Sequence, residues 1–220
     1  MIFDALEFES GPAPTASMIV LHGLGADADD LAPVAQMLRF PFAVRFVLPN
    51  APVRPVTLNN GYPMPAWYDI GAGGVEGSDE PTGLSDSVRT IEALVARELE
   101  RGIAAKNIVV AGFSQGCALS LTVAVRSTRA LGAICGMSGY LPPTVDAAGT
   151  DASRRTPIWL AHGIHDPVVP VQRGRAARDA LTQAGHAVAW NEYPIDHSIC
   201  EPEIARLNAF VLGALRGGAT

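Results

Sequence analysis

Cysteine and lysine are scarce in this 220-residue sequence. The three cysteines, at positions 117, 135 and 200, have no metal-site or redox-pair spacing and are too few for a disulfide framework. They are therefore predicted to be buried free thiols in a reducing compartment. Lys106 is the single lysine and the net charge is −6, which argues against a nucleic-acid partner because such proteins usually carry a basic patch.

Long hydrophobic runs are also missing. No apolar run approaches the roughly 18–20 residues that span a bilayer, so no membrane span is expected. The start, MIFDALEFES, lacks the positive charge and long apolar core of a signal peptide, and a cytoplasmic location is predicted. Only 17% of the residues are charged and 48% are hydrophobic, which excludes intrinsic disorder and predicts a sizeable core.

Short apolar runs alternate with amphipathic stretches along the chain. Most runs are continuous, as in parallel strands that are buried on both faces. The predicted strands are residues 17–21, 44–48, 107–112, 131–137, 157–161 and 187–193, with 2–8 as an antiparallel edge strand. The predicted helices are residues 29–38, 85–102, 117–125, 172–184 and a last helix that begins at Pro202. This order predicts one α/β domain, residues 1–220, with a mostly parallel sheet and helices on both faces.

The segment 51–83 departs from this rhythm. It is rich in proline and glycine, shows little periodicity and is longer than most loops in compact domains. It nevertheless carries large apolar residues, including Met64, Trp67 and Tyr68. The segment is therefore predicted to form a pocket wall, and an ordinary excursion over a sheet edge is the alternative.

A G-x-S-x-G string at residues 112–116 centres on Ser114. The string alone is a weak signal, but here an apolar strand pattern precedes it and a helix pattern follows it. In that strand–turn–helix arrangement the serine occupies a strained turn that exposes its hydroxyl, and the helix N-terminus favours negative charge nearby. Ser114 is therefore predicted to be a nucleophile.

A nucleophilic serine needs a base, and histidine suits that role because it titrates near neutral pH. In folds with this turn the chain order is serine, acid, histidine, which excludes His22 as the base. His197 lies in a short loop after a predicted strand, where ligand-facing residues collect, whereas His186 precedes that strand. Asp166 lies in the loop after the predicted strand 157–161 and is the candidate acid. The predicted catalytic set is therefore Ser114, Asp166 and His197.

The other acids and a metal site are weaker hypotheses. The weaker acids are Asp146, Asp151 and Asp196. Asp196 adjoins His197 and can hardly turn back onto its ring, and the other two lie in a polar loop before a strand. An H-x-x-H-D string contains His162 and His165, but it lacks helical context and a recognised ligand pattern, so no metal is predicted.

Acyl transfer places negative charge on a carbonyl oxygen, which needs hydrogen-bond donors. One predicted donor is the backbone N–H of Gln115, immediately after the nucleophile. The other is expected from the loop after an early strand, where residues 21–25 read LHGLG, and it is assigned to the N–H of Leu24. The nearby Asp27, Asp29 and Asp30 are predicted to cap and start the following helix instead.

Six stretches together resemble the carboxylesterase/acyl-protein thioesterase (phospholipase/carboxylesterase) family of α/β-hydrolases. They cover nearly the whole chain and read LHGLGAD (21–27), LPNAPVRPVTLNNGYPMPAWYDI (48–70), GFSQG (112–116), SGYLP (138–142), HGIHDPVVP (162–170) and DHSIC (196–200). The resemblance implies a single-domain α/β-hydrolase fold with little or no cap domain. It supports the same catalytic residues, with Leu24 and Gln115 as oxyanion donors.

The resemblance also implies an activity. It is the hydrolysis of carboxylic esters by a serine triad through an acyl-enzyme, without metal or cofactor. A thioesterase or lysophospholipase that acts on longer acyl chains is the alternative, and a non-catalytic hydrolase-like binding protein is a distant one. The substrate is then a small-molecule ester or thioester, an acylated protein or a lysophospholipid. An apolar acyl groove is implied at Leu24, Met64, Trp67 and Val169, and a homodimer is expected because members of such families often pair.

Two positions depart from the family pattern. Cys117 follows the SQG string where relatives commonly have a small residue, and it is expected to pack inertly at the turn. His165 stands where relatives often have an acidic or polar residue, so it leaves the substrate preference open.

Overall fold

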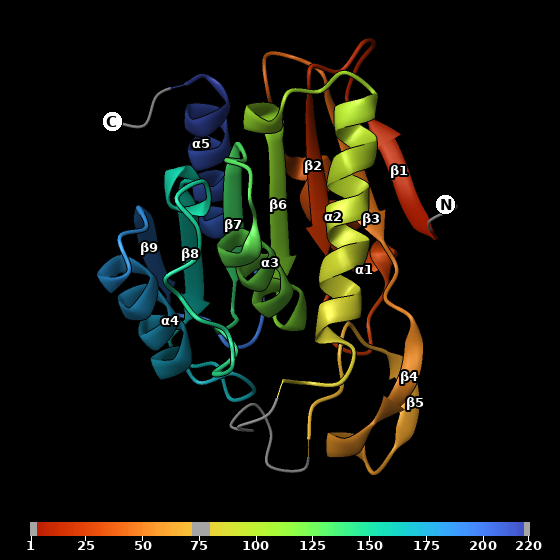
Figure 1. Cartoon of the computed structure of the whole chain (residues 1–220), viewed down its shortest axis with the longest axis vertical. Helices are drawn as coiled ribbons and strands as arrows, with labels where there is room; N and C mark the ends of the chain where they lie inside the picture. The colour runs from red at the N-terminus through yellow and green to blue at the C-terminus, as the bar shows by residue number, and fades with distance from the viewer. Residues whose placement is uncertain (1–3, 72–79, 218–220) are drawn as a thin grey trace.

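A computed structural model describes residues 4–71 and 80–217 of the chain. Its centre is a seven-stranded sheet in the order β1-β3-β2-β6-β7-β8-β9 (Figure 1). In this sheet β1 is antiparallel to β3, as predicted for the edge strand, and the other pairs are parallel. The strands are β1 (Ala5–Glu9), β2 (Ala16–Leu21), β3 (Val44–Pro49), β6 (Ile108–Phe113), β7 (Ala133–Met137), β8 (Ile158–Gly163) and β9 (Val188–Tyr193).

Helices cover both faces of the sheet, which confirms the predicted α/β architecture (Figure 1). On one face α2, α3 and α4 pack over a core that contains Ile91, Leu119 and Leu181. On the other face α1 and α5 pack over a core that contains Leu31 and Leu207. The helices are α1 (Ala28–Met37), α2 (Leu84–Glu100), α3 (Gln115–Arg126), α4 (Val171–Gln183) and α5 (Glu201–Leu215), with the 3-10 turns η1 (Thr57–Asn59), η3 (Ala105–Asn107) and η4 (Ser153–Arg155).

Strand β2 explains why the central strands read as continuous apolar runs. Ile19 and Leu21 belong to one core, and Met18 and Val20 belong to the other. All four are buried. Because successive side chains of a strand point to opposite faces, a strand that is covered on both faces carries apolar residues at consecutive positions.

Helix ends follow local capping signals, with one difference from the sequence prediction. Asp27 caps α1 as predicted, and its side chain accepts the N–H of Asp29. At α2, which was predicted to begin at residue 85, serine would be a favoured N-cap, but Gly83 holds that position with φ of 92°. Ser85 lies inside the first turn, where its hydroxyl donates to Glu80 Oε1 at 2.8 Å. The side chain therefore holds a neighbouring carboxylate instead of capping the helix.

The segment 51–83 contains regular structure that the sequence did not predict. Strands β4 (Val53–Val56) and β5 (Tyr62–Pro65) pair as an antiparallel hairpin, with η1 between them. Prolines at positions 55, 63 and 65 hide the strand pattern, because proline removes a ladder donor. A two-stranded ribbon tolerates this loss at its open edges. Residues 72–79 of the predicted pocket wall lie outside the described residues.

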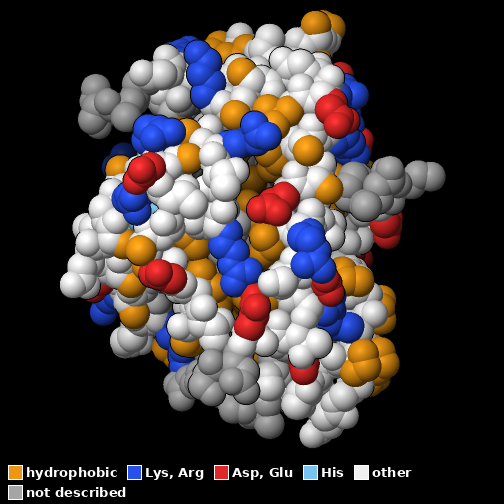
Figure 2. Space-filling view, in the orientation of Figure 1, with side chains coloured by type: hydrophobic (Ala, Val, Ile, Leu, Met, Phe, Trp, Pro, Cys, Tyr) orange, Lys and Arg blue, Asp and Glu red, His pale blue; other side chains and the backbone are white. Residues whose placement is uncertain are grey.

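The surface carries charges of both signs. On the face seen in Figure 2, basic and acidic side chains are interspersed, and neither sign forms a patch of its own. In the part of the chain that the structure describes, no helix is both long and apolar enough to cross a membrane.

Strand β2 is flanked on both sides by strands that follow it in the chain. Strand β3 lies on one side of β2 and β6 on the other, so the carboxyl ends of β2 and β6 are neighbours. In open α/β sheets, ligands bind at such a switch point. The loop after β2 begins with His22, and the turn after β6 contains Ser114. The fold thus brings the two predicted halves of the site to one edge of the sheet.

Candidate active site

Ser114 forms the sharp turn between β6 and α3. Its φ of 55° and ψ of −117° lie outside the regions that residues with side chains favour. Crowding requires glycine on both sides, since a Cβ at Gly112 would lie 2.1 Å from Gly116 O and one at Gly116 would lie 2.1 Å from Leu21 O. The turn leaves Ser114 partly exposed at the N-terminus of α3, where the helix dipole favours negative charge.

His197 lies in the loop between β9 and α5, hereafter the base loop (194–200). Its Nε2 is 2.9 Å from Ser114 Oγ, and its Nδ1 is 2.7 Å from Asp166 Oδ2. The ring packs against that of Phe113, with the centroids 4.7 Å apart. The His197 side chain is 17% exposed, so solvent can reach part of the ring.

Asp166 lies in the loop after β8, hereafter the acid loop (164–170), and its side chain has no exposed surface. Its Oδ1 accepts the N–H groups of Val168 at 2.9 Å and Val169 at 2.8 Å, which leaves Oδ2 for His197. Because a carboxylate only accepts, the proton of the His197 ring sits on Nδ1, and Nε2 is free to accept from the Ser114 hydroxyl. This arrangement can take a proton from the serine and stabilise the imidazolium that results.

Backbone hydrogen bonds join the acid loop to the end of β9 and to the base loop. Ile164 N–H donates to Tyr193 O at 2.8 Å, and His165 N–H donates to Ile195 O at 3.0 Å. The alternative acid, Asp196, is exposed and accepts from Ser198 Oγ at 2.6 Å. The Asp196 carboxylate is therefore bonded by Ser198, whereas His197 Nδ1 bonds Asp166.

The remaining histidines have different surroundings. Burial lowers the pKa of His22, His162 and His186 below the ordinary value, and His165 is exposed. His162 Nε2 donates to Val169 O at 2.7 Å and so braces the acid loop. Among residues 4–71 and 80–217, no group of three His, Cys, Asp or Glu side chains is arranged to hold a metal ion.

Two backbone amides near Ser114 are available as oxyanion donors. Gln115 is the first residue of α3, so its N–H has no acceptor within the helix. The Leu24 N–H has no acceptor within the described parts of the chain. The amides after it are satisfied, Gly25 N–H by Pro65 O and Ala26 N–H by Gly23 O. The Leu24 loop comes close to the nucleophile, since a Cβ at Gly23 would lie 3.4 Å from Ser114 Cβ.

The four side chains predicted to line an acyl groove lie in two different environments. Leu24 and Met64 are partly exposed, and Met64 lies beside the Leu24 loop, with its Sδ 3.6 Å from where a Cβ at Gly25 would be. Trp67 is completely buried and Val169 is 7% exposed. Of the four, Leu24 and Met64 therefore offer surface to a ligand, whereas Trp67 offers none in this structure.

Cys117 fits behind the turn because two neighbours lack side chains. A Cβ at Gly136 would lie 2.5 Å from Cys117 Sγ, and one at Gly139 would lie 2.4 Å from Cys117 Cβ. Burial raises the pKa of the Cys117 thiol to about 12 and also raises that of Cys135, so both stay protonated at neutral pH. Cys200 is only partly buried, at the N-cap of α5, so the prediction of a buried thiol is wrong there.

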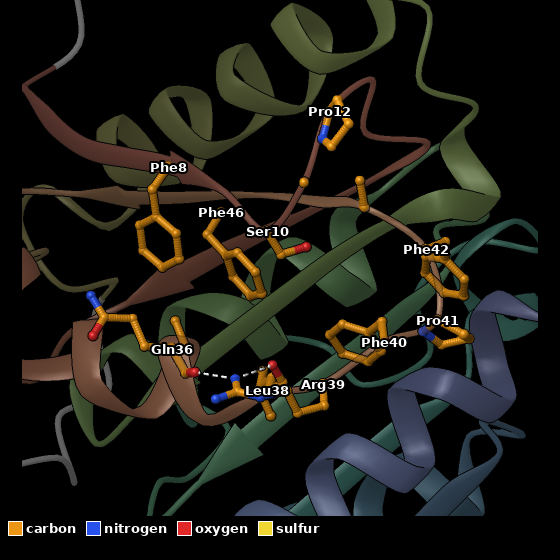
Figure 3. A pocket seen from close by; sticks show the side chains of 13 residues that line it. Phe8, Ser10, Pro12, Gln36, Leu38, Arg39, Phe40, Pro41, Phe42 and Phe46 are labelled. Carbon is orange, nitrogen blue, oxygen red and sulfur yellow. Dashed lines mark hydrogen bonds between the residues drawn. The ribbon is translucent and has the colours of Figure 1, made fainter.

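A hollow of about 590 Å³ lies at the end of the strands opposite Ser114, where β1 ends and β3 begins (Figure 3). Its aromatic walls are Phe8, Phe40, Phe42 and Phe46. The charged side chain in its lining is Arg39, whose Nη1 donates to Gln36 O and to Leu38 O. The described residues that line it include no histidine, cysteine or carboxylate, so it lacks the groups that hydrolysis needs.

Glu203 is a buried acid on α5 that the sequence did not single out. Its side chain has no exposed surface, and neither carboxyl oxygen has a hydrogen-bond partner among the described residues. Burial raises its pKa to about 7, although the nearby backbone N–H of Cys200 opposes the shift. A glutamate at the third helical position commonly reaches back to bond the N-cap N–H, but Glu203 makes no such bond, so this sequence signal would have placed the carboxyl near the N-cap without revealing that it is buried and unpartnered.

We expect Glu203→Gln to change how stability depends on pH. An unfolded glutamate ionises near pH 4.5, but the folded chain holds its proton up to about pH 7, so the wild type loses stability as pH rises through that window. Relative to its value at pH 4.5, the advantage of the variant in unfolding free energy should grow by roughly 2–4 kcal/mol at pH 8. Denaturant unfolding at several pH values measures this. The exposed Glu201→Gln is the control, and a difference that does not vary with pH would contradict the buried acid.

Comparisons with known proteins identify the family of the chain and similar solved structures. The family model described as Phospholipase/Carboxylesterase matches residues 7–213. Acyl-protein thioesterase 1 of Gibberella zeae is 35% identical over 219 residues, covering 94% of this chain and 93% of that protein. Acyl-protein thioesterase 1 of Mycosarcoma maydis is 38% identical, covering 92% of each. The crystal structure of Arabidopsis thaliana SOBER1 matches with a TM-score of 0.83 at 27% identity, covering 91% of this chain and 99% of that one.

Proposed function

Because the chain belongs to the phospholipase/carboxylesterase family of α/β-hydrolases, it is an ester or thioester hydrolase, and we propose that Ser114, His197 and Asp166 are its catalytic triad. One observation supports this most directly. The hydrogen bonds run without a break from Ser114 Oγ through both ring nitrogens of His197 to Asp166 Oδ2. A serine on a strained turn beside an oriented imidazole is the arrangement that activates a hydroxyl.

In the proposed acylation step, Ser114 Oγ attacks the substrate carbonyl carbon while His197 Nε2 takes the hydroxyl proton. The oxyanion that forms is held by the N–H groups of Leu24 and Gln115. The bond from carbon to the leaving oxygen or sulfur then breaks, and His197 returns the proton to that atom. Asp166 keeps the ring in the required tautomer and stabilises its positive charge.

Deacylation repeats these roles with water. His197 takes a proton from the water molecule, whose oxygen attacks the acyl-enzyme carbonyl. The same two amides hold the second oxyanion, and the bond to Ser114 Oγ breaks as His197 returns the proton to it. The products are a carboxylic acid and free enzyme, and no step requires a metal or a cofactor.

Exposed apolar side chains support a substrate with an acyl chain. The large hydrophobic residues exposed in the described part of the chain are Met37, Val53, Leu58, Tyr62, Ile164 and Val168. Five of these six lie on the β4–β5 hairpin with η1 or on the acid loop. The hairpin is joined to the Leu24 loop by the hydrogen bond from Gly25 N–H to Pro65 O, and the acid loop carries Asp166, which bonds His197. We therefore propose esters and thioesters of medium or longer acyl chains as substrates, including acylated proteins and lysophospholipids.

We also propose that the enzyme works in a reducing, cytoplasmic setting. The thiols at positions 117, 135 and 200 are all free, which supports a reducing, cytoplasmic compartment. The apolar residues of the hairpin would permit a homodimer, which sedimentation would test.

A fluorophosphonate probe tests the nucleophile and separates a catalyst from a binding protein on the same scaffold. We expect stoichiometric labelling that peptide mass spectrometry locates at Ser114, because only an activated serine attacks the phosphorus. Heat-unfolded protein is the control and should not be labelled. Absence of labelling, or labelling at another residue, would contradict the proposal.

A matched series of oxygen and sulfur esters tests the substrate class. From acetyl to octanoyl, kcat/KM should rise by up to about fourfold per added CH₂, the limit set by burying a methylene. Both kinds of ester should follow the same trend, because they share the acyl group. A flat or falling series would exclude an apolar acyl site beside Leu24 and Met64.

A further inference from the structure

Trp67 lies between the two segments that supply the candidate oxyanion donors. Its indole Nε1 donates to His22 O at 2.9 Å, in the loop that leads to Leu24. Its backbone N–H donates to the side chain of Gln115, at Oε1, at 2.8 Å. The residue is completely buried and does not contact solvent. The indole and the backbone N–H of Trp67 thus link the loop that carries Leu24 to Gln115.

The link continues from His22 to the peptide that carries the Leu24 amide. The carbonyl of Gly23 can only accept, so His22 Nδ1 carries a proton and donates to it at 2.7 Å. The other ring nitrogen, Nε2, accepts the N–H of Ala51 at 3.0 Å, which fixes this tautomer. Burial keeps the ring neutral by lowering the pKa of His22.

Holding the Gly23 carbonyl also sets the direction of the Leu24 amide. The C=O of Gly23 and the N–H of Leu24 belong to one planar trans peptide, so the two groups point in opposite directions. A hydrogen bond that fixes the carbonyl therefore aims the amide away from His22. The rings of His22 and Trp67 pack together with centroids 5.1 Å apart, which restrains the imidazole.

Hydrogen bonds with residues 67 and 68 hold the side chain of Gln115. Its side-chain Oε1 accepts from Trp67 N–H, and its Nε2 donates to Tyr68 O at 2.8 Å. The Ser87 hydroxyl donates to Trp67 O and fixes the same stretch against α2. Both hydrogen-bonding functions of the buried amide are therefore satisfied by residues 67 and 68. Because the side chain is anchored, the backbone N–H at the start of α3 is anchored with it.

We propose that Trp67 is a positioning residue that sets the two oxyanion donors relative to each other, through His22 on one side and Gln115 on the other. The inference rests on the proposed function. Stabilisation of an oxyanion depends on donors that are already in place, about 2.7–3.1 Å from where the oxygen will be. A Trp67 that is free to shift would loosen both donors at once, although it never touches the substrate.

Trp67→Phe tests this, because phenylalanine keeps a buried ring but deletes the Nε1–H. We expect kcat to fall on the order of 10-fold with KM within about twofold, since the donors act mainly in the transition state. The Ki of a trifluoromethyl ketone, whose adduct carries the oxyanion, should rise by the same factor as kcat/KM falls. Trp159→Phe is the matched control, because Trp159 is also buried and its Nε1–H donates to Asn191 Oδ1.

A second pair of variants tests the same link without altering the indole. Asparagine places its amide nitrogen near the position of Nδ1, so His22→Asn should retain the bond to Gly23 O and most of kcat, whereas His22→Ala should lose as much as Trp67→Phe. The proposal is overturned if Trp67→Phe matches Trp159→Phe, if it raises KM alone, or if both His22 variants lose kcat equally. These results would leave the proposed function standing. That function fails separately if Ser114→Ala keeps its activity.

Discussion

Replacing Ser114 by alanine should remove esterase and thioesterase turnover almost completely. The substitution deletes the one oxygen that lies 2.9 Å from His197 Nε2, so no acyl-enzyme can form. We expect kcat to fall on the order of 10⁵-fold, with a small residue of catalysis from the oxyanion donors and from substrate binding. Steady-state kinetics on a chromogenic ester, together with loss of fluorophosphonate labelling, measures the change.

The stability of this variant should hardly change, which separates loss of chemistry from loss of folding. Alanine and serine experience the same strain at φ of 55°, and the Ser114 backbone bonds to Met137 O and Ala118 N do not depend on the side chain. Ser198→Ala is the control, because Ser198 lies in the base loop but donates to Asp196. Substantial turnover by Ser114→Ala would exclude this serine as the nucleophile.

Much of the fold could be predicted because the sequence patterns that mark each strand and helix are local. Each central strand is buried on both faces, so a short continuous apolar run marks it, as at residues 17–21 and 107–112. The edge strand β1 alternates instead because only part of it is covered. The order of strands and helices then restricts the topology, and chain order alone indicates which loops meet at the carboxyl edge of the sheet.

The hairpin and the role of Trp67 were not predictable in the same way. Prolines interrupt the alternating strand pattern in β4 and β5. The two strands also pair with each other and not with the main sheet, so the order of the main strands does not indicate them. Trp67 follows β5 in an irregular stretch that has no period, so the sequence indicates an apolar side chain but not which way it faces. Its burial depends on hydrogen bonds to His22 and Gln115, which lie 45 and 48 residues away in the chain.

The sequence indicated which residues would meet in the candidate site, but not how they are oriented there. Chain order selected Asp166 and His197, yet Asp196 stayed an alternative because a neighbour in sequence can also be a neighbour in space. The structure adds the backbone contacts that decide how each carboxylate is oriented. Asp166 has two backbone donors on Oδ1, whereas Asp196 is exposed and accepts from a serine hydroxyl. Because of that difference, replacing each aspartate by asparagine should have unequal effects on activity.

Asp166→Asn should lower kcat on the order of 10³- to 10⁴-fold, with KM nearly unchanged. The N–H groups of Val168 and Val169 require an acceptor at the Oδ1 position, so the new amide must turn its NH₂ toward His197. Two donors cannot face each other, so the proton of the ring moves from Nδ1 to Nε2. In that tautomer Nε2 has no lone pair for the Ser114 proton, and the serine stays inactive although every side chain remains in place.

Asp196→Asn provides the matched comparison, because it makes the same chemical change one residue from His197. It should retain kcat within about twofold, since an exposed carboxylate that is screened by solvent contributes little to the ring. Both variants should unfold at similar denaturant concentrations to the wild type, because asparagine keeps the volume of aspartate. If Asp196→Asn were the damaging change and Asp166→Asn the mild one, the acid would have to be assigned to Asp196. The tautomer argument drawn from the two bonds on Oδ1 would then fail as well.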